Sequence, residues 1–206
     1  MAAGKSRRLV IDTSVAGAAG SYSNFPSSKH CRDFLTATLE ICHHIVMTPD
    51  LREEWKRHQT AFVSEWLQRM IARRKFHFVK PGENESLRDN IEKAATNALA
   101  VKAGMINPLS LSQLRADYPN EKAKEAMLKD FRLLEAAIAT DRTVISLDNT
   151  VRNLFAAASE QTGEIGNIVW VNPVAQDQNP IEWLERGAKR EKQHLLSHKS
   201  QTKKAK

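Results

Sequence analysis

Short apolar runs alternate with longer stretches of helical periodicity along this 206-residue chain. Runs of four to six mostly apolar residues predict buried strands, and we place these strands at 7–12, 44–48, 75–79, 143–147 and 168–171. Between them, apolar positions recur at the 3.6-residue spacing of amphipathic helices. The predicted helices are 28–42, 49–58, 60–74, 85–102, a long helix from 120 or 121 to about 139, 149–159, and a last helix with Pro180 at its first position.

Strands that alternate with helices are typical of an α/β fold. We therefore predict one parallel sheet of about four to five strands, sandwiched between helices in an α/β/α arrangement. The length suits a single domain, and a hydrophobic content of 41% supports a substantial core. We assign residues 7–185 to this domain and expect residues 1–6 to be disordered. The Gly-, Ala- and Ser-rich stretch 17–28 is expected to form a loop or a frayed helix.

Positive charge is concentrated at the C-terminal end of the chain. Residues 186–206 hold eight Lys and Arg and one acid, Glu191, so this basic tail accounts for the whole formal net charge of +7. Two interpretations remain open. The tail binds a polyanion through counterion release, or it is a solvated, disordered end without a specific partner.

The sequence favours an intracellular protein without a membrane span. No stretch approaches the roughly 18 apolar residues that a membrane helix needs. The N-terminus lacks the apolar segment of a signal peptide, so we expect a cytoplasmic location. Cys31 and Cys42 are expected to be reduced packing residues.

Two acidic residues mark the ends of predicted strands. Asp12 ends the first strand, and Asp148 follows the strand at 143–147. Ligands of parallel α/β sheets collect at the carboxyl ends of the strands, which favours a site here. For Asp148 the N-cap of the next helix is an equally good interpretation. Thr13 and Ser14, directly after Asp12, offer hydroxyl groups that can cap a helix.

Two further acids lie in predicted helices. Asp130 interrupts an otherwise apolar helical face, and a buried carboxylate is costly unless a cation or hydrogen-bond donors compensate it. The alternative is a partly exposed Asp130 that pairs with Arg132 or with a lysine. Glu54 shares a helix face with apolar residues and so lies nearer the body than Glu53. The alternative is that both are solvated acids in a first helical turn.

These four acids lie on four separated elements, and topology alone brings three of them to one edge of the sheet. A ligand set made only of oxygen atoms suits Mg²⁺ or Mn²⁺. A carboxylate cluster that holds one or two such ions is well suited to phosphodiester cleavage.

The segments around the acids resemble the motifs of PIN-domain ribonucleases, whose best-known small members are the VapC-type toxins of toxin–antitoxin systems. The segments are Val-Ile-Asp-Thr-Ser-Val at 10–15, Thr-Pro-Asp-Leu-Arg-Glu-Glu-Trp at 48–55, Lys-Asp-Phe-Arg-Leu-Leu-Glu-Ala-Ala at 129–137 and Val-Ile-Ser-Leu-Asp-Asn at 144–149. The resemblance covers roughly residues 7–172. The 76 residues from Glu54 to Asp130 exceed what a compact member needs, and we attribute the excess to a helical insertion at about 82–119.

The resemblance implies a metal-dependent endoribonuclease that uses Mg²⁺ or Mn²⁺. Asp12 and Asp130 would be direct metal ligands. Asp148 would ligate or support the metal, and Glu54 would orient the attacking water, acting as a base.

The resemblance also implies supporting residues and partners. Ser146 takes the place of a hydroxyl residue two positions before the fourth acid, and Thr13 is a second supporting hydroxyl. RNA would be the substrate, and an antitoxin protein and a second copy of the chain would be the protein partners.

Other functions compete with a nuclease. The main alternative is a non-catalytic RNA- or protein-binding module of the PIN type, in which the basic tail binds. A phosphatase-like enzyme ranks last, because Asp12-Thr13-Ser14 lacks the second acid of an Asp-x-Asp motif. Zinc sites at Cys42-His43-His44 and His194-x-x-x-His198 are discounted, and the second lacks the Glu of a zincin motif and lies in the basic tail. A phosphate loop at Gly17–Gly20 is discounted because the Lys-Ser/Thr of a P-loop is missing.

Overall fold

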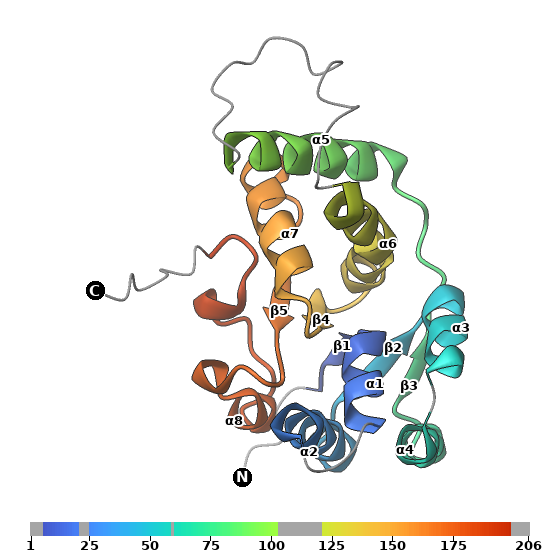
Figure 1. The fold of residues 1–206 in the computed structure, drawn as a ribbon. Coiled ribbons are helices and arrows are strands. Elements are labelled where there is room, and N and C mark those ends of the chain that lie inside the picture. The colour runs from blue at the N-terminus through green and yellow to red at the C-terminus, as the bar shows by residue number, and fades with distance from the viewer. Residues whose placement is uncertain (1–5, 21–24, 59, 103–120, 199–206) are drawn as a thin grey trace.

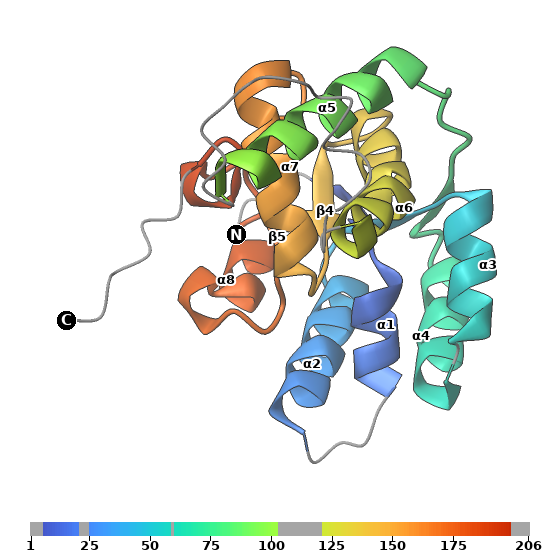
Figure 2. The same ribbon diagram turned by 45° about the horizontal axis from the view of Figure 1, so that its top comes forward.

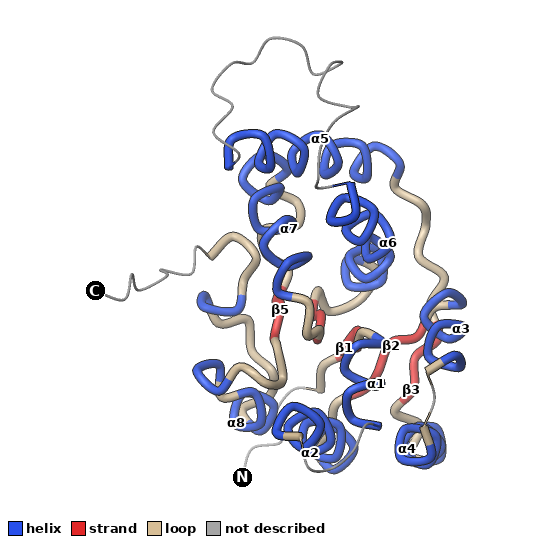
Figure 3. Tube along the Cα trace, viewed as in Figure 1, coloured by secondary structure: helices blue, strands red, loops and turns tan. Residues whose placement is uncertain are grey.

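Five parallel strands form one sheet in the order β3-β2-β1-β4-β5. The computed structural model describes residues 6–20, 25–58, 60–102 and 121–198, with 95–102, 121–128 and 176 described by their backbone alone. The strands are β1 (Arg8–Ile11), β2 (His44–Met47), β3 (Phe76–Phe78), β4 (Thr143–Ile145) and β5 (Val169–Val171). All five predicted strands are present, each shorter than predicted by one or two residues (Figure 3). The predicted α/β fold is confirmed.

Helices cover both faces of the sheet (Figure 1). They are α1 (Thr13–Gly20), α2 (Pro26–Glu40), α3 (Pro49–Arg57), α4 (Ala61–Ala72), α5 (Glu85–Lys102), α6 (Glu121–Ile138), α7 (Asn149–Thr162) and α8 (Pro180–Glu185). Helices α1, α2 and α4 pack together on one side, and α6 and α7 lie on the other. Two short 3₁₀ helices follow β5, at Gln176–Gln178 and Lys192–His194.

The central strands are buried on both faces. Val10 of β1 lies beside Val46 of β2 and Val144 of β4, and all three side chains are buried. Such continuous apolar strands are typical of parallel sheets that helices cover on both sides. At β5, the buried Trp170 ring packs 5.8 Å from the ring of Phe155 in α7.

The strand order reverses at β1. From β1 the chain adds β2 and β3 on one side, and then returns to add β4 and β5 on the other. Right-handed crossovers therefore place the helices before β3 on one face and the helices after it on the opposite face. Between the carboxyl ends of β1 and β4 the connections diverge to opposite faces, which leaves a crevice where ligands of open α/β sheets bind.

One segment is more regular than predicted, and a second is helical as predicted. The stretch predicted as a loop or frayed helix is helical up to Gly20, where a Cβ atom would overlap the Thr60 side chain at the start of α4. Close packing between α1 and α4 therefore requires glycine here. Helix α5, assigned to an insertion, packs across α7 and α6 (Figure 2) and buries Leu87 and Ile91. The rest of the insertion, 103–120, lies outside the described residues.

The chain continues to pack against the body beyond residue 185. The Leu196 backbone N–H donates to the Ile168 carbonyl oxygen at 2.9 Å, and the side chains of His194 and Leu196 are buried. The first half of the predicted basic tail is thus part of the folded domain, while 1–5 and 199–206 lie outside the described residues. Cys31 and Cys42 are not joined in a disulfide; Cys31 is buried, as expected of a packing residue, whereas Cys42 is exposed, contrary to that expectation. No helix in the described ranges is both long and apolar enough to cross a membrane.

Candidate functional site

Asp12 stands at the crevice between β1 and β4. Its backbone N–H donates to the Ile145 carbonyl oxygen at 2.9 Å, which continues the ladder between the two strands. The residue is only 7% exposed. The Ser146 hydroxyl donates to Asp12 Oδ2 at 2.8 Å and accepts the backbone N–H of Asp148 at 3.1 Å. Ser146 therefore ties Asp12 to the turn that carries Asp148.

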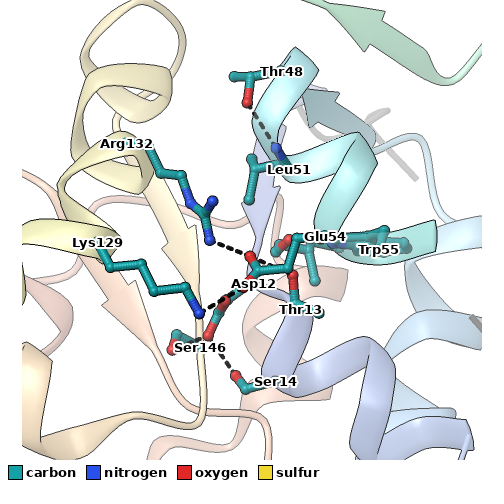
Figure 4. Close-up of polar contacts among 11 residues, drawn as sticks. Asp12, Thr13, Ser14, Thr48, Leu51, Glu54, Trp55, Lys129, Arg132 and Ser146 are labelled. Carbon is teal, nitrogen blue, oxygen red and sulfur yellow. Dashed lines mark hydrogen bonds and ion pairs between the residues drawn. The ribbon is translucent and has the colours of Figure 1, made fainter. Parts of the chain in front are cut away.

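A second hydroxyl supports the same carboxylate from the other side. Ser14 Oγ donates to Asp12 Oδ2 and accepts the backbone N–H of Leu147 at 3.2 Å. Both hydroxyl bonds end on Oδ2, so they fix the orientation of the carboxylate through one of its two oxygens (Figure 4). Ser14 was named in the sequence only as a potential helix cap, and its role in holding Asp12 depends on the β1–β4 pairing.

Asp148 is the N-cap of α7. Its Oδ1 accepts the backbone N–H of Val151 at 2.8 Å, so the capping interpretation is confirmed. The side chain is half-buried, and capping occupies one of its two oxygens. A capping role and a role at the crevice are therefore compatible for this residue.

Asp130 brings a third acid to the crevice from α6. Burial and, after it, the neighbouring charge of Asp12 raise its pKa to about 7; the charge of Arg132 opposes this rise, and a smaller effect of Asp148 adds to it. Among the described side chains, none forms an ion pair with Asp130, so the alternative pairing with Arg132 or a lysine is not observed. Three acids from three separated elements therefore lie within electrostatic reach of one another.

Glu54 is held differently from the three aspartates. It is 8% exposed on α3, whose start is capped by Thr48. Lys129 Nζ lies 2.9 Å from its Oε1, while Thr13 Oγ1 donates to Oε2 at 2.9 Å and Arg132 Nη2 donates to the same oxygen (Figure 4). Burial alone would raise the pKa of Glu54, but hydrogen bonds from Lys129 and Thr13 and the charge of Arg132 lower it.

The choice of Glu54 over Glu53 agrees with their positions. Glu53 is exposed and pairs with Lys56 at 2.6 Å on the outside of α3. Glu54 faces α1 and α6, because its contacts come from Thr13 and from two cations of α6. The structure thus places the predicted residue, and not its neighbour, at the crevice.

Two residues of this site, Lys129 and Arg132, were not predicted as site residues. They lie three apart on α6, and both contact Glu54. Residues at this spacing share a helix face, so the pair could be recognised from the sequence as a cationic patch beside the third acid. Which acid they contact is decided by the packing of α6 against α3 and α1.

The side chains at the crevice are of the chemical type that binds a divalent metal ion. Carboxylate oxygens are the ligands that Mg²⁺ and Mn²⁺ prefer, and the partly buried Asp130 carries a charge that an added cation would offset. As the side chains stand, no three His, Cys, Asp or Glu residues in the described ranges form a group that could hold a metal ion. Binding an ion at Asp12, Asp130 and Asp148 therefore requires these carboxylates to move closer together.

The discounted histidines have structural roles. His43 is buried, and its Nε2 lies 2.8 Å from the Leu184 carbonyl oxygen. His194 is buried with its ring 5.6 Å from that of Trp183. Both rings connect the body to the segment around α8.

Comparison with known proteins leaves the family open. No protein-family model matches this chain, and no characterised protein matches it significantly. The PIN-domain interpretation therefore rests on the short motifs and on the arrangement that they adopt.

Proposed function

We propose that this protein is a divalent-metal-dependent endoribonuclease of the PIN-domain type, which hydrolyses phosphodiester bonds in RNA. One observation carries the proposal. Asp12 and Asp148 follow the neighbouring strands β1 and β4 where the strand order reverses, and the charges of both act on the partly buried Asp130 of α6. Asp130 forms no ion pair with any of the described side chains and lies beside two further acids, which is the arrangement expected of a site built for a cation.

In this proposal Asp12, Asp130 and Asp148 hold Mg²⁺ or Mn²⁺. The bound ion would supply Lewis acidity, activating water and offsetting charge on the phosphodiester oxygens. Ser146 and Ser14 orient Asp12 through Oδ2. These hydroxyls are positioning residues, because they act through the carboxylate that they contact.

Glu54 remains the candidate for orienting the attacking water. Its lowered pKa keeps it anionic, but Lys129, Arg132 and Thr13 engage both of its oxygens. A direct role toward water therefore requires the cations to release it. In the structure as it stands, Glu54 joins α3, α1 and α6 across the crevice.

RNA cleavage tests the proposal directly. A labelled RNA would be incubated with Mg²⁺, Mn²⁺ or EDTA and with wild type, Asp12→Asn or Asp130→Asn. Asp89→Asn, which removes an exposed acid of α5, is the matched control. We expect cleavage by wild type and by the control, none in EDTA, and a loss of at least about 100-fold in the two site variants. Equal cleavage by all four proteins would reveal a contaminating nuclease and leave the proposal without support.

The alternative, a non-catalytic RNA-binding module, is favoured by two observations. Among the described residues, the acids do not form a ready metal-binding group, and Glu54 is neutralised by cations. RNA bound by wild type but left intact with every metal would favour this module. Removing residues 199–206 then tests the basic tail without removing Leu196, which is part of the folded body.

A toxin function, with an antitoxin partner in the cytoplasm, is a narrower form of the proposal that rests on the resemblance to VapC-type proteins. Expression of wild type would arrest growth, and expression of Asp12→Asn would not. Normal growth during wild-type expression in the native host, with the antitoxin gene absent, would count against a toxin.

A further inference from the structure

Two cations converge on one acid beside the three aspartates. Lys129 and Arg132 both contact Glu54, so this cluster carries one more positive than negative charge. A single carboxylate cannot use all of their donors, because an ammonium group has three N–H bonds and a guanidinium group has five. The pair therefore keeps donor capacity for a second anion.

The two cationic side chains differ in their exposure to solvent. The side chain of Lys129 is 63% exposed, and that of Arg132 is 20% exposed. Arg132 Nε is buried and has no hydrogen-bond partner, which is costly for a charged group. A planar anion or a phosphate that took the place of Glu54 could accept from Nε and Nη2 together, in the bidentate geometry typical of arginine.

A cavity that could hold such an anion lies next to Lys129 and Arg132. Lys129 and Arg132 line a cavity of about 610 Å³ between the start of α3, residues 80–88 and α6. Lys80 and Arg88 also line it, and four acids balance these charges: Asp50, Glu83, Glu85 and Glu135. The cavity as a whole is thus not strongly basic. The three aspartates do not line it, but two of its cations, Lys129 and Arg132, act electrostatically on Asp130.

We propose that Lys129 and Arg132 are the phosphate-binding pair for an RNA backbone that enters through this cavity, and that Glu54 occupies them until a backbone phosphate displaces it. The inference rests on the proposed function, because it takes RNA as the ligand. Glu54 then has a second role as an intramolecular competitor of the substrate. Release of Glu54 on binding would also free its carboxylate beside Asp12.

The test is RNA binding under conditions that prevent cleavage. A fluorescent 20-nucleotide oligouridine would be titrated with full-length protein in EDTA over a series of salt concentrations. Lys129→Ala and Arg132→Gln should each weaken binding about fivefold at 0.1 M salt, and each should lower the slope of log K against log salt by about 0.7. Glu54→Gln should tighten binding by about two- to fivefold, the strength of a partly exposed ion pair.

Glu53→Gln is the matched control, since it removes the neighbouring charge of α3 and releases Lys56 on the outside of the helix. It should leave affinity within twofold of wild type. In a double-mutant cycle, Glu54→Gln should lose its effect in a protein that also carries Lys129→Ala and Arg132→Gln. A general loss of negative charge would instead tighten binding in every background.

Three results would overturn the inference. They are unchanged affinity and slope in Lys129→Ala and Arg132→Gln, equal or weaker binding by Glu54→Gln, and an effect of Glu54→Gln that persists without the cations. If Glu54→Gln does not fold, the salt slopes of the two cation variants still decide. If these contradicting results are obtained but wild type still cleaves RNA, the phosphate-binding inference is wrong and the nuclease proposal stands. If wild type neither binds nor cleaves RNA, both the inference and the nuclease proposal are wrong.

Discussion

Replacing Asp130 by Asn is expected to stabilise the metal-free protein at neutral pH. The folded protein raises the pKa of this carboxyl from 3.8 to about 7, so the folded state binds the proton more tightly than the unfolded chain. The cost of charging Asp130 is absent below about pH 4, grows between about pH 4 and 7, and is constant above that range. Asn removes this cost because it carries no charge.

The magnitude follows from the size of the pKa change. At about 1.4 kcal/mol per pKa unit, the full change corresponds to roughly 4 kcal/mol. Asp130 is only half-buried, and its contact with solvent screens part of this cost. We therefore expect Asp130→Asn to raise the free energy of unfolding by about 2 kcal/mol at pH 8, and by less than about 0.5 kcal/mol at pH 4.

Urea denaturation in EDTA at pH 4, 5, 6, 7 and 8 measures this difference, with Asp89→Asn as the control for removing one negative charge. A difference that does not grow between pH 4 and 7, or a variant less stable than wild type at pH 8, would refute the reasoning. Adding Mg²⁺ provides a second readout. An ion that binds only the folded protein raises the free energy of unfolding of wild type. The same ion should raise the free energy of unfolding of Asp130→Asn by less.

Three further predictions concern the support of the site. Ser146→Ala should lower the free energy of unfolding by about 1–3 kcal/mol in urea, because it removes one of the two hydroxyl donors to Asp12 and leaves the backbone N–H of Asp148 without its acceptor; an unchanged midpoint would contradict this. Thr48→Ala should lower the free energy of unfolding by about 1 kcal/mol, because it removes the N-cap of α3. Thr48→Ser, which keeps a capping hydroxyl, should retain most of the wild-type value. Deleting residues 199–206 should leave the melting temperature within about 2 °C of that of wild type. Deleting residues 186–206 should lower it by more than about 4 °C, because this deletion removes Leu196 and other buried side chains.

Local pattern was sufficient to predict much of the site. The apolar runs before Asp12 and Asp148 identify strands, and a strand that ends in an acid places that acid at the carboxyl edge of a parallel sheet. The helical period similarly separates Glu54, which is buried, from Glu53, which is exposed. These features depend on neighbours within one or two turns, and the sequence contains that information directly.

The partners of the charged residues depend on tertiary packing. The sequence suggested Arg132 as a partner of Asp130, but residues two apart on a helix point in directions about 200° apart. Arg132 instead shares a face with Lys129 and meets Glu54, which lies 78 residues away in the chain.

The sequence by itself determined the α/β class, the five strands and the four acids at their ends or on their helices. Only the tertiary structure decided the strand order, the tie between Ser14, Ser146 and Asp12, the capture of Glu54 by two cations, and the packing of Leu196 beside β5. The physical reason is range. Propensity and periodicity act over a few residues, whereas hydrogen bonds and ion pairs between separated elements form only once the core fixes their distance and direction.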